Sequence, residues 1–320
     1  MIKQKGLSLV ELMVAMLIGL FLIAGVFTLF VLSSNNVTTT SHFNQLQEQG
    51  RIALDFIERD LQMQGFMAEL TGEDFVLGIN TRNNAPILSN EQDCIGSGVN
   101  NASFPNSEPA HFRLLWGYEQ GVSAETLECL TGVLTHTDVL QLKRLIGPNV
   151  TSFDDNRYYT AISANEVVFF AGDQAVPTLD NARFWEYQHH VYFIQENNGM
   201  PVLMRRILAN GGMKTSSSVE QLVEGVENIR VLYGFDNDGD LTVDSFMPAE
   251  DVTELMWDKG AMALRVFVLI RTLFEDKHFT NSVEYRLGDK TVGPINDGYR
   301  RKVMMTTLVL ENPRLSNASH

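Results

Sequence analysis

A single carboxylate lies inside a long apolar segment near the N-terminus. Glu11 is the only charged residue between Lys5 and Glu48, and the stretch from Leu12 to Leu32 consists almost entirely of apolar residues and glycines. A carboxylate costs about 2.5–3.5 kcal/mol at the centre of a membrane-spanning helix and somewhat less near an interface. Such a residue is a functional candidate, and the chemistry open to it is pairing with a positive charge supplied by another group.

A second group of carboxylates lies in the segment GFDNDGDLTVDSF. Four aspartates occupy positions one, three, five and nine of this loop: Asp236, Asp238, Asp240 and Asp244. Alternate oxygen ligands of this kind converge on a hard cation, and the spacing resembles that of EF-hand-like calcium loops. Gly239 stands at position four instead of six, and no glutamate occupies position twelve. We therefore weigh a calcium site against an ordinary acidic surface turn.

The chain has two cysteines, Cys94 and Cys129. Two thiols are too few for a zinc site, and they do not form a CxxC pair. In an oxidising compartment they could form a disulfide, and the alternative is two buried free thiols. Since the bridge would close a loop of about 35 residues, it would stabilise the fold by roughly 3.5–4 kcal/mol in the chain-entropy model.

The remaining side chains give no support to an enzyme. The histidines show no HExxH or similar metal-binding spacing, and no GxSxG nucleophile motif is present. The pair His189–His190 precedes a predicted strand, where adjacent side chains point to opposite faces. The histidines are His42, His111, His136, His189, His190, His278 and His320.

The overall charge argues against nucleic acid as the main partner. The formal net charge is −15, whereas duplex binding depends on Lys and Arg that neutralise phosphates. A hydrophobic content of 44% suits a packed globular protein and excludes general disorder.

The apolar segment is long enough to cross a membrane. Its 21 residues, 12–32, would span about 30 Å as a helix, which is the thickness of a hydrocarbon core. Lys3 and Lys5 precede it and uncharged residues follow it, so the positive-inside rule places the N-terminus in the cytoplasm and exports the remainder. A secretory signal peptide would have a shorter apolar stretch followed by a small-residue cleavage site. A plain single-span anchor fits the hydropathy but leaves Glu11 unexplained.

The stretch KGLSLVELMVAMLIGL resembles the signal of type IV prepilins, in which a short basic leader ends in glycine. The resemblance implies that prepilin peptidase cuts between Gly6 and Leu7, and that Leu7 carries the N-methylation usual in the family. Most pilins have Phe at that position, and this chain has Leu7. Glu11 then becomes the fifth residue of the mature chain, where pilins carry a glutamate that pairs with the N-terminal amine of a neighbouring subunit.

We expect one long helix followed by a single head domain. The helix is predicted to run from Leu7 to Gln64 and to stop at Gly65, with Leu46, Ala53, Ile57 and Leu61 on one apolar face. Much of the rest of its surface is assigned to charged residues: Glu48, Arg51, Asp55, Glu58, Arg59 and Asp60. Gly50 is a place where it could bend, and the run Thr38–Thr40 has poor helix propensity. The expected domains are a leader over residues 1–6, the helix over 7–65 and a β-rich head over 66–320.

After Gly65 the chain alternates β-branched and aromatic runs with Gly, Asn and Asp clusters, a pattern typical of a β-rich domain. The segment Asn80–Asn106 is predicted to be a long surface loop, and VEQLVEGVENI and AEDVTELMWDKG are predicted to be short helices. The fold class is therefore α+β: a long N-terminal helix packed on an antiparallel β-rich head. The predicted strands are Ala110–Trp116, Asp138–Leu145, Glu166–Ala171, His190–Gln195, Val202–Leu208, Ile229–Phe235, Ala263–Thr272 and Val303–Leu310.

Three segments of the head resemble blocks of PilW-type minor pilins: LVEGVENIRVLYGFDNDGD, MALRVFVLIRT and YRRKVMMTTLVLENPR. The resemblance implies a minor subunit of the type IV pilus in the bacterial inner membrane, with its head in the periplasm and, after assembly, at the cell surface. Its partners would be other major and minor pilins, prepilin peptidase and the inner-membrane assembly machinery. The functions implied are pilus assembly, twitching motility, adhesion and, in some bacteria, DNA uptake. The alternatives are a J-type minor pseudopilin of type II secretion and a calcium-dependent adhesive head on a pilin anchor.

Overall fold

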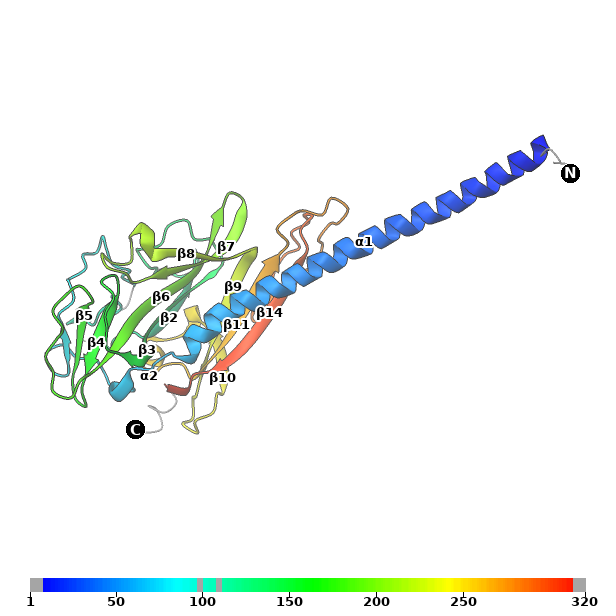
Figure 1. Ribbon diagram of the computed structural model, residues 1–320. Helices are drawn as coiled ribbons and strands as arrows, with labels where there is room; N and C mark the ends of the chain where they lie inside the picture. The colour runs from blue at the N-terminus through cyan, green and yellow to red at the C-terminus, as the bar shows by residue number, and fades with distance from the viewer. Residues whose placement is uncertain (1–7, 97–99, 108–110, 313–320) are drawn as a thin grey trace. The chain divides into compact units, whose positions relative to one another are not determined.

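The computed structural model describes residues 8–96, 100–107 and 111–312. By their internal contacts these residues form two compact units, divided between Gln47 and Glu48. The first unit is the N-terminal part of one helix. The second contains the last turns of that helix and all the strands (Figure 1). The predicted α+β fold, a long N-terminal helix and an antiparallel β-rich domain, is confirmed.

The elements follow one another in a simple order. The α-helices are α1 Leu9–Gln62 and α2 Glu254–Lys259, and the 3-10 helices are η1 Ala68–Leu70, η2 Ser216–Ser218 and η3 Ala249–Asp251. The strands are β1 Thr81–Asn83, β2 Leu115–Glu119, β3 Asp138–Val150, β4 Tyr158–Ile162, β5 Val167–Ala171, β6 Arg183–Asn197, β7 Met200–Ile207, β8 Val219–Glu224, β9 Val226–Phe235, β10 Ser245–Pro248, β11 Ala263–Arg271, β12 Tyr285–Leu287, β13 Lys290–Val292 and β14 Arg301–Val309.

The helix α1 ends at Gln62, two residues before the predicted end at Gln64, and the chain turns at Gly65 as predicted. Gly65 has a φ of +74°, a conformation that glycine adopts without steric cost, and it follows the last helical turn. The predicted apolar face is confirmed, since Ala53, Ile57 and Leu61 are completely buried. Gly50 lies within this continuous helix, and a Cβ atom there would come 2.4 Å from the Met304 sulfur of β14. The glycine therefore allows the helix to approach the sheet closely.

The larger sheet is organised around the long strand β6. One edge of β6 pairs with β3, with Tyr192 opposite Leu140. The other edge pairs first with β4 and then with β7, so that the sheet branches there. Its main order is β1-β5-β4-β6-β3-β2, and β8 extends it beyond β7. All pairs are antiparallel except β1 with β5.

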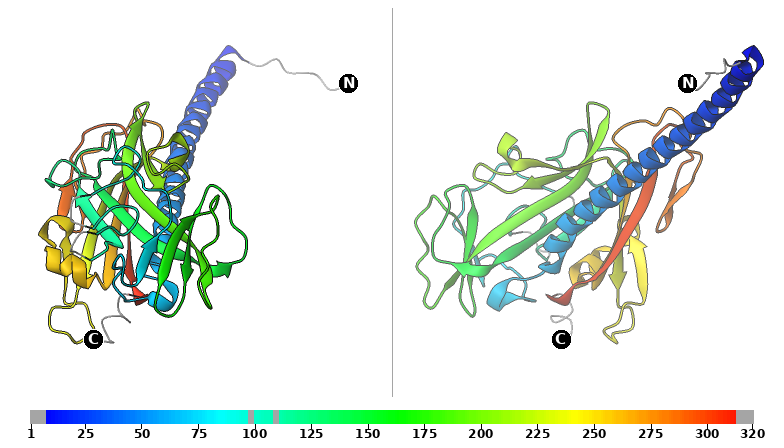
Figure 2. Two further views of the ribbon diagram at one scale, coloured as in Figure 1. Left: turned by 90° about the vertical axis from the view of Figure 1, so that its left-hand side faces the viewer. Right: turned by 45° about the vertical axis from the view of Figure 1, so that its right-hand side comes forward.

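The smaller sheet has the order β10-β9-β11-β14, and β12 and β13 form a separate hairpin. The last turns of α1 run beside β11 and β14, as the two views of Figure 2 show. A buried arginine joins the two sheets and the hairpin. The Arg230 guanidinium of β9 lies 2.6–3.1 Å from carboxylates of β2, β3, η3 and the β12–β13 turn. These belong to Glu119, Asp138, Glu250 and Asp289.

Each predicted strand overlaps an observed one, but the helix predicted for VEQLVEGVENI is wrong. Residues 219–224 form β8, Gly225 turns the chain with a φ of +81°, and β9 begins at Val226. The apolar residues are spaced three or four apart, as in a helix. Pairing of β8 with β7 and of β9 with β11 decides the outcome, because tertiary contacts override a short periodic pattern. The short helix predicted within AEDVTELMWDKG is present as η3 and α2.

The segment predicted to be a surface loop is exposed only in its first half, and the expectation is corrected for the described part of residues 93–106, which is mostly buried. Within the described part of residues 80–106, Cys94 and Ser103 are fully buried and Asn101 is 1% exposed. The Asp93 carboxylate accepts hydrogen bonds from the backbone N–H groups of Cys94 at 2.7 Å and Ser103 at 3.0 Å. A polar segment can be buried here because its backbone donors find partners inside it.

The predicted disulfide between Cys94 and Cys129 is present. It joins this buried segment to the loop that follows β2, across a sequence separation of 35 residues. The bridge removes loop-closure freedom from the unfolded chain, which is the main source of disulfide stabilisation in the entropy model.

The paired substitution Cys94→Ser and Cys129→Ser should therefore lower the free energy of unfolding by about 3.5–4 kcal/mol. The measurement is urea denaturation of the full chain in detergent. Added reductant should shift the wild-type transition toward that of the variant and leave the variant unchanged. Equal midpoints for the oxidised wild type and the variant would contradict the stabilising role.

Candidate assembly site

The first turn of α1 holds Glu11 in a reciprocal cap. The Ser8 backbone N–H donates to Glu11 Oε2 at 2.8 Å, and the Glu11 N–H donates to Ser8 Oγ at 3.2 Å. This is the capping-box arrangement, in which two backbone donors at a helix start are satisfied by side chains. Sequence reasoning singled out Glu11 but missed the cap, although Ser at the N-cap and Glu three residues later is its signature. Glu11 is therefore part of the helix start as well as a charge.

The helix that follows is apolar on every side. From Leu12 to Leu32 its large apolar side chains are all exposed within this chain. A helix that is hydrophobic all round belongs in a membrane or in a protein core. It is long and apolar enough to cross a membrane. The positions predicted for cleavage and methylation, Gly6 and Leu7, lie outside the described residues.

At the other end of α1, a buried carboxylate joins the helix to the larger sheet. Asp60 is 4% exposed, and its Oδ1 accepts a hydrogen bond at 2.6 Å from Arg144 Nη2 of β3. Its Oδ2 accepts hydrogen bonds from His190 Nδ1, at 2.5 Å, and from the Tyr192 hydroxyl, both on β6. Arg205 Nη1 of β7 lies 3.7 Å from the same oxygen. One side chain of the helix thus contacts three adjacent strands.

The electrostatics of this cluster favour an ionised Asp60. Burial opposes ionisation, but the hydrogen bond from His190, the charge of Arg144 and the hydrogen bond from Tyr192 outweigh it and hold the pKa of Asp60 well below its ordinary value. Burial lowers the pKa of His190, against the effect of Asp60, so this imidazole is neutral near pH 7 and donates its Nδ1–H. The Asp60 carboxylate is thus paired chiefly with the Arg144 guanidinium.

The sequence carried a signal for this contact that the prediction did not use. Asp60 was placed on the polar side of the helix, which is wrong. It lies three residues after Ile57 and seven after Ala53, both completely buried, so it shares their face. The helix end is held as well, because Asn312 Nδ2 donates to the Gln64 carbonyl at 2.9 Å.

The acidic turn brings three of its four predicted ligands together. Carboxylate oxygens of Asp236, Asp238 and Asp244 lie within 4.8 Å of one another. Asp240 is not one of this group, and its carboxylate accepts hydrogen bonds from the Thr242 backbone and hydroxyl instead. Asp236 accepts three backbone N–H bonds, which lower its pKa. Calcium binding by this turn stays a prediction, with three candidate ligands instead of four.

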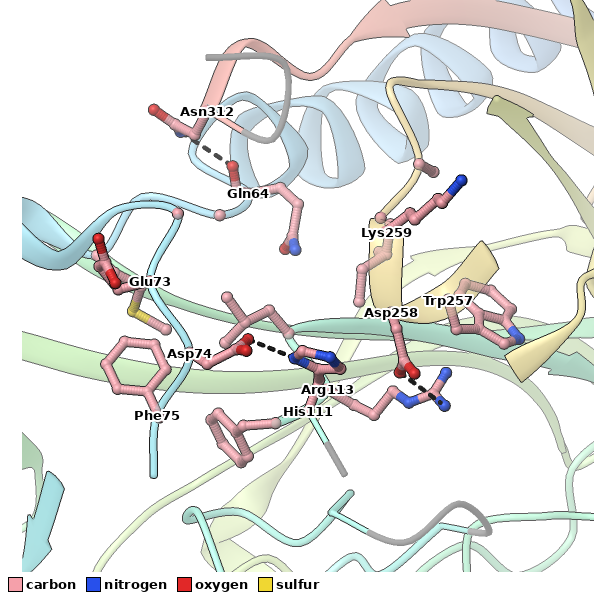
Figure 3. A pocket seen from close by; sticks show the side chains of 18 residues that line it. Gln64, Glu73, Asp74, Phe75, His111, Arg113, Trp257, Asp258, Lys259 and Asn312 are labelled. Carbon is pink, nitrogen blue, oxygen red and sulfur yellow. Dashed lines mark hydrogen bonds and ion pairs between the residues drawn. The ribbon is translucent and has the colours of Figure 1, made fainter. Parts of the chain in front are cut away.

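A cavity of about 130 Å³ lies where the end of α1 meets α2 and residues 111–115 (Figure 3). Its lining includes two ion pairs, Asp74–His111 at 2.5 Å and Asp258–Arg113 at 3.3 Å. Neither pair places a nucleophile beside a base, so the cavity does not resemble a hydrolytic active site.

Comparison with protein families gives two matches. Residues 1–27 match the prokaryotic N-terminal methylation motif, and residues 191–312 match type IV pilus-assembly protein W. Together these two matches support a type IV minor pilin-like protein. No curated protein and no solved structure matches it. The methylation motif and the apolar helix together indicate membrane anchoring.

The second match covers some of the residues that contact α1. It begins in β6, includes the smaller sheet and ends at Asn312. Tyr192, Arg205, Met304 and Asn312 lie within the match, and His190 lies one residue before it. The matched residues therefore include part of the surface that contacts α1, whereas Arg144, the chief partner of Asp60, lies outside the match.

Substitution Asp60→Ala should lower the free energy of unfolding by about 3–5 kcal/mol, because it leaves Arg144 as an unpaired buried charge. The matched control is Asp55→Ala, which removes an exposed pair with Arg59 and should cost less than about 1 kcal/mol. Urea denaturation of the full chain in detergent measures both. Similar values for the two variants would show that Asp60 does not anchor the helix.

The low pKa of Asp60 also sets a pH dependence. Since its folded pKa lies below its unfolded value, its contribution is fully present above about pH 4 and is lost as the pH falls further. Denaturation midpoints measured between about pH 5 and about pH 2 should therefore fall more steeply in the wild type than in Asp60→Ala.

Calcium should raise the melting temperature of the full chain in detergent if the acidic turn binds it. Asp238→Asn should abolish the shift, because it removes one of the three clustered carboxylates. Asp240→Asn is the matched control and should keep the shift. A wild type that melts at the same temperature with calcium and with chelator would remove the site.

Proposed function

We propose that this chain is a minor subunit of a type IV pilus that takes part in pilus assembly. The proposal rests on the presence of two family matches in one chain. The N-terminus is of the prepilin type, with Glu11 at the helix start, and the head matches type IV pilus-assembly protein W. No enzymatic role is proposed.

The topology proposed follows from the charges around the apolar span. Lys3 and Lys5 precede the span and uncharged residues follow it, which favours an N-terminus in the cytoplasm and a head in the periplasm. The match to the methylation motif supports cleavage by prepilin peptidase between Gly6 and Leu7 and methylation of Leu7. Cleavage before the apolar span keeps the anchor in the mature protein.

The role proposed for Glu11 is recognition of a neighbouring subunit. A carboxylate can accept several hydrogen bonds through its two oxygens, so capping of the Ser8 N–H leaves acceptor capacity for an incoming amine. The new amine at Leu7 of another pilin would supply the positive charge that an acid in low dielectric requires. The partners proposed are therefore other major and minor pilins and the inner-membrane assembly machinery.

The J-type minor pseudopilin of type II secretion shares the N-terminal signal, so residues 1–27 do not separate the two functions. The match of residues 191–312 favours the pilus subunit. Deletion of the gene tests this choice. Loss of surface pili and of twitching motility supports the pilus function, and loss of protein secretion with normal pili supports the alternative.

Three variants separate the charge of Glu11 from its capping role. Glu11→Gln preserves a capping box, since Gln also serves at that position, but removes the charge. Ser8→Ala weakens the cap and keeps the charge, and Glu11→Val removes both. If charge pairing drives assembly, both Glu11 variants should still insert in the membrane. Their amount in pili should fall at least roughly tenfold, which corresponds to the loss of about 1.4 kcal/mol of interaction free energy.

Ser8→Ala should assemble nearly normally in the same experiment. The measurements are membrane insertion by alkaline extraction and the amount of the protein in sheared pili. Normal incorporation of Glu11→Gln would show that the cap, and not the charge, is what assembly requires.

A further inference from the structure

A lysine is buried in the middle of the larger sheet. Lys143 of β3 is completely buried, and its Nζ lies 4.3 Å from the centre of the Phe112 ring. Among the described residues its hydrogen-bond acceptor is the Asn101 side chain, with Nζ 3.0 Å from Oδ1. A buried lysine commonly pairs with a carboxylate, and here it lies directly against an amide.

The Asn101 amide is itself buried, with 1% exposure, and is held through its oxygen. Gln141 Nε2 donates to the same Oδ1 at 2.6 Å, so two donors polarise the carbonyl. The amide nitrogen, Nδ2, has no hydrogen-bond partner among the described residues. The two donors draw electron density from the carbonyl carbon, and within the described residues no hydrogen bond holds the amide nitrogen.

The surroundings favour an uncharged lysine. Burial lowers the pKa of Lys143 well below its ordinary value, and the charge of Arg113 lowers it further against the opposing effect of Asp93. An unprotonated amine is a nucleophile, and desolvation is one of the ways in which proteins activate lysine.

We propose that Lys143 and Asn101 join in an intramolecular isopeptide bond once the protein has folded. The inference rests on the contact of Nζ with the Asn101 amide and on the Gln141 donor beside it, and it is independent of the proposed function.

The bond forms without any oxidant or co-reactant. The unprotonated Nζ adds to Cγ of Asn101, and the negative charge that develops on Oδ1 is stabilised by the Gln141 N–H group. One proton passes from Nζ to Nδ2, the Cγ–Nδ2 bond breaks, and ammonia leaves. Asp93 is 3% exposed, and its charge acts on Lys143, so a carboxylate lies in the surroundings of the reacting amine.

The product would attach the buried segment before β2 to the centre of the sheet. Asn101 lies seven residues after Cys94, so the isopeptide bond and the disulfide would hold the same segment at two points. Reduction would break only one of them.

Peptide mapping of the full chain, purified from membranes in detergent, tests the bond. Trypsin cuts after Arg82, Arg113 and Arg144, and a modified Lys143 is not cut, so residues 83–113 and 114–144 should appear as one branched peptide that is lighter by one ammonia. Because Cys94 and Cys129 lie in these same two peptides, the sample must be reduced and alkylated first.

The variants Lys143→Met and Asn101→Ala should each lack the branched peptide and yield separate peptides. The wild-type map decides the question even if a variant does not fold. Separate linear peptides of full mass from the folded wild type would overturn the proposal. Separate peptides with ammonia lost from Asn101 alone would also overturn it, since they would indicate an intraresidue rearrangement.

Discussion

The hydrogen bonds of the buried Asp60 carboxylate hold the last turns of α1 in place on the larger sheet. Asp60 lies in the last turns of α1 and bonds to β3 and β6, with Arg205 of β7 nearby. A shift of the helix by one turn, about 5.4 Å, would leave the buried Arg144 without its partner. Apolar packing by Ala53, Ile57 and Leu61 tolerates small slides, whereas this cluster of directional bonds does not. Asp60 therefore fixes the register of the helix on the sheet.

Glu11 and Asp60 of α1 show two ways of placing an acid where water is scarce. Asp60 is surrounded by donors from its own chain. Glu11 has the local cap of Ser8, and its apolar neighbours along the helix are exposed within this chain. Because the Glu11 carboxylate has only this local partner among the described residues of the subunit, a positive charge from another subunit can pair with it. This is the physical basis of the assembly role proposed for Glu11.

The sequence predicted those parts of the fold that depend on local pattern. The apolar span, the buried face of α1, the end at Gly65 and eight strands follow from periodicity and from turn residues. The strands that it missed, β1, β4, β8, β10, β12 and β13, are mostly short or lack a clear alternation. Their pairing depends on partners distant in sequence.

The errors at the candidate sites have the same origin. Asp60 was assigned by its charge to the solvent side, because nothing in the local sequence shows that Arg144 lies opposite it. The segment around Asn101 is rich in polar residues, and its burial depends on Asp93, the disulfide and the contact with Lys143. Polar residues that meet distant partners inside a fold cannot be located from composition alone.

The arginine that joins the two sheets has more acidic partners than it can neutralise. Glu119, Asp138, Glu250 and Asp289 surround Arg230, and Lys290 adds one further positive charge beside Glu119, so four acids face two bases. Burial raises the pKa of Asp138 to about 7. Between about pH 4 and about pH 7 this carboxyl group is therefore more protonated in the folded protein than in the unfolded chain. The contribution of protonated Asp138 to stability is therefore present in acid and is lost as the pH rises through about 7.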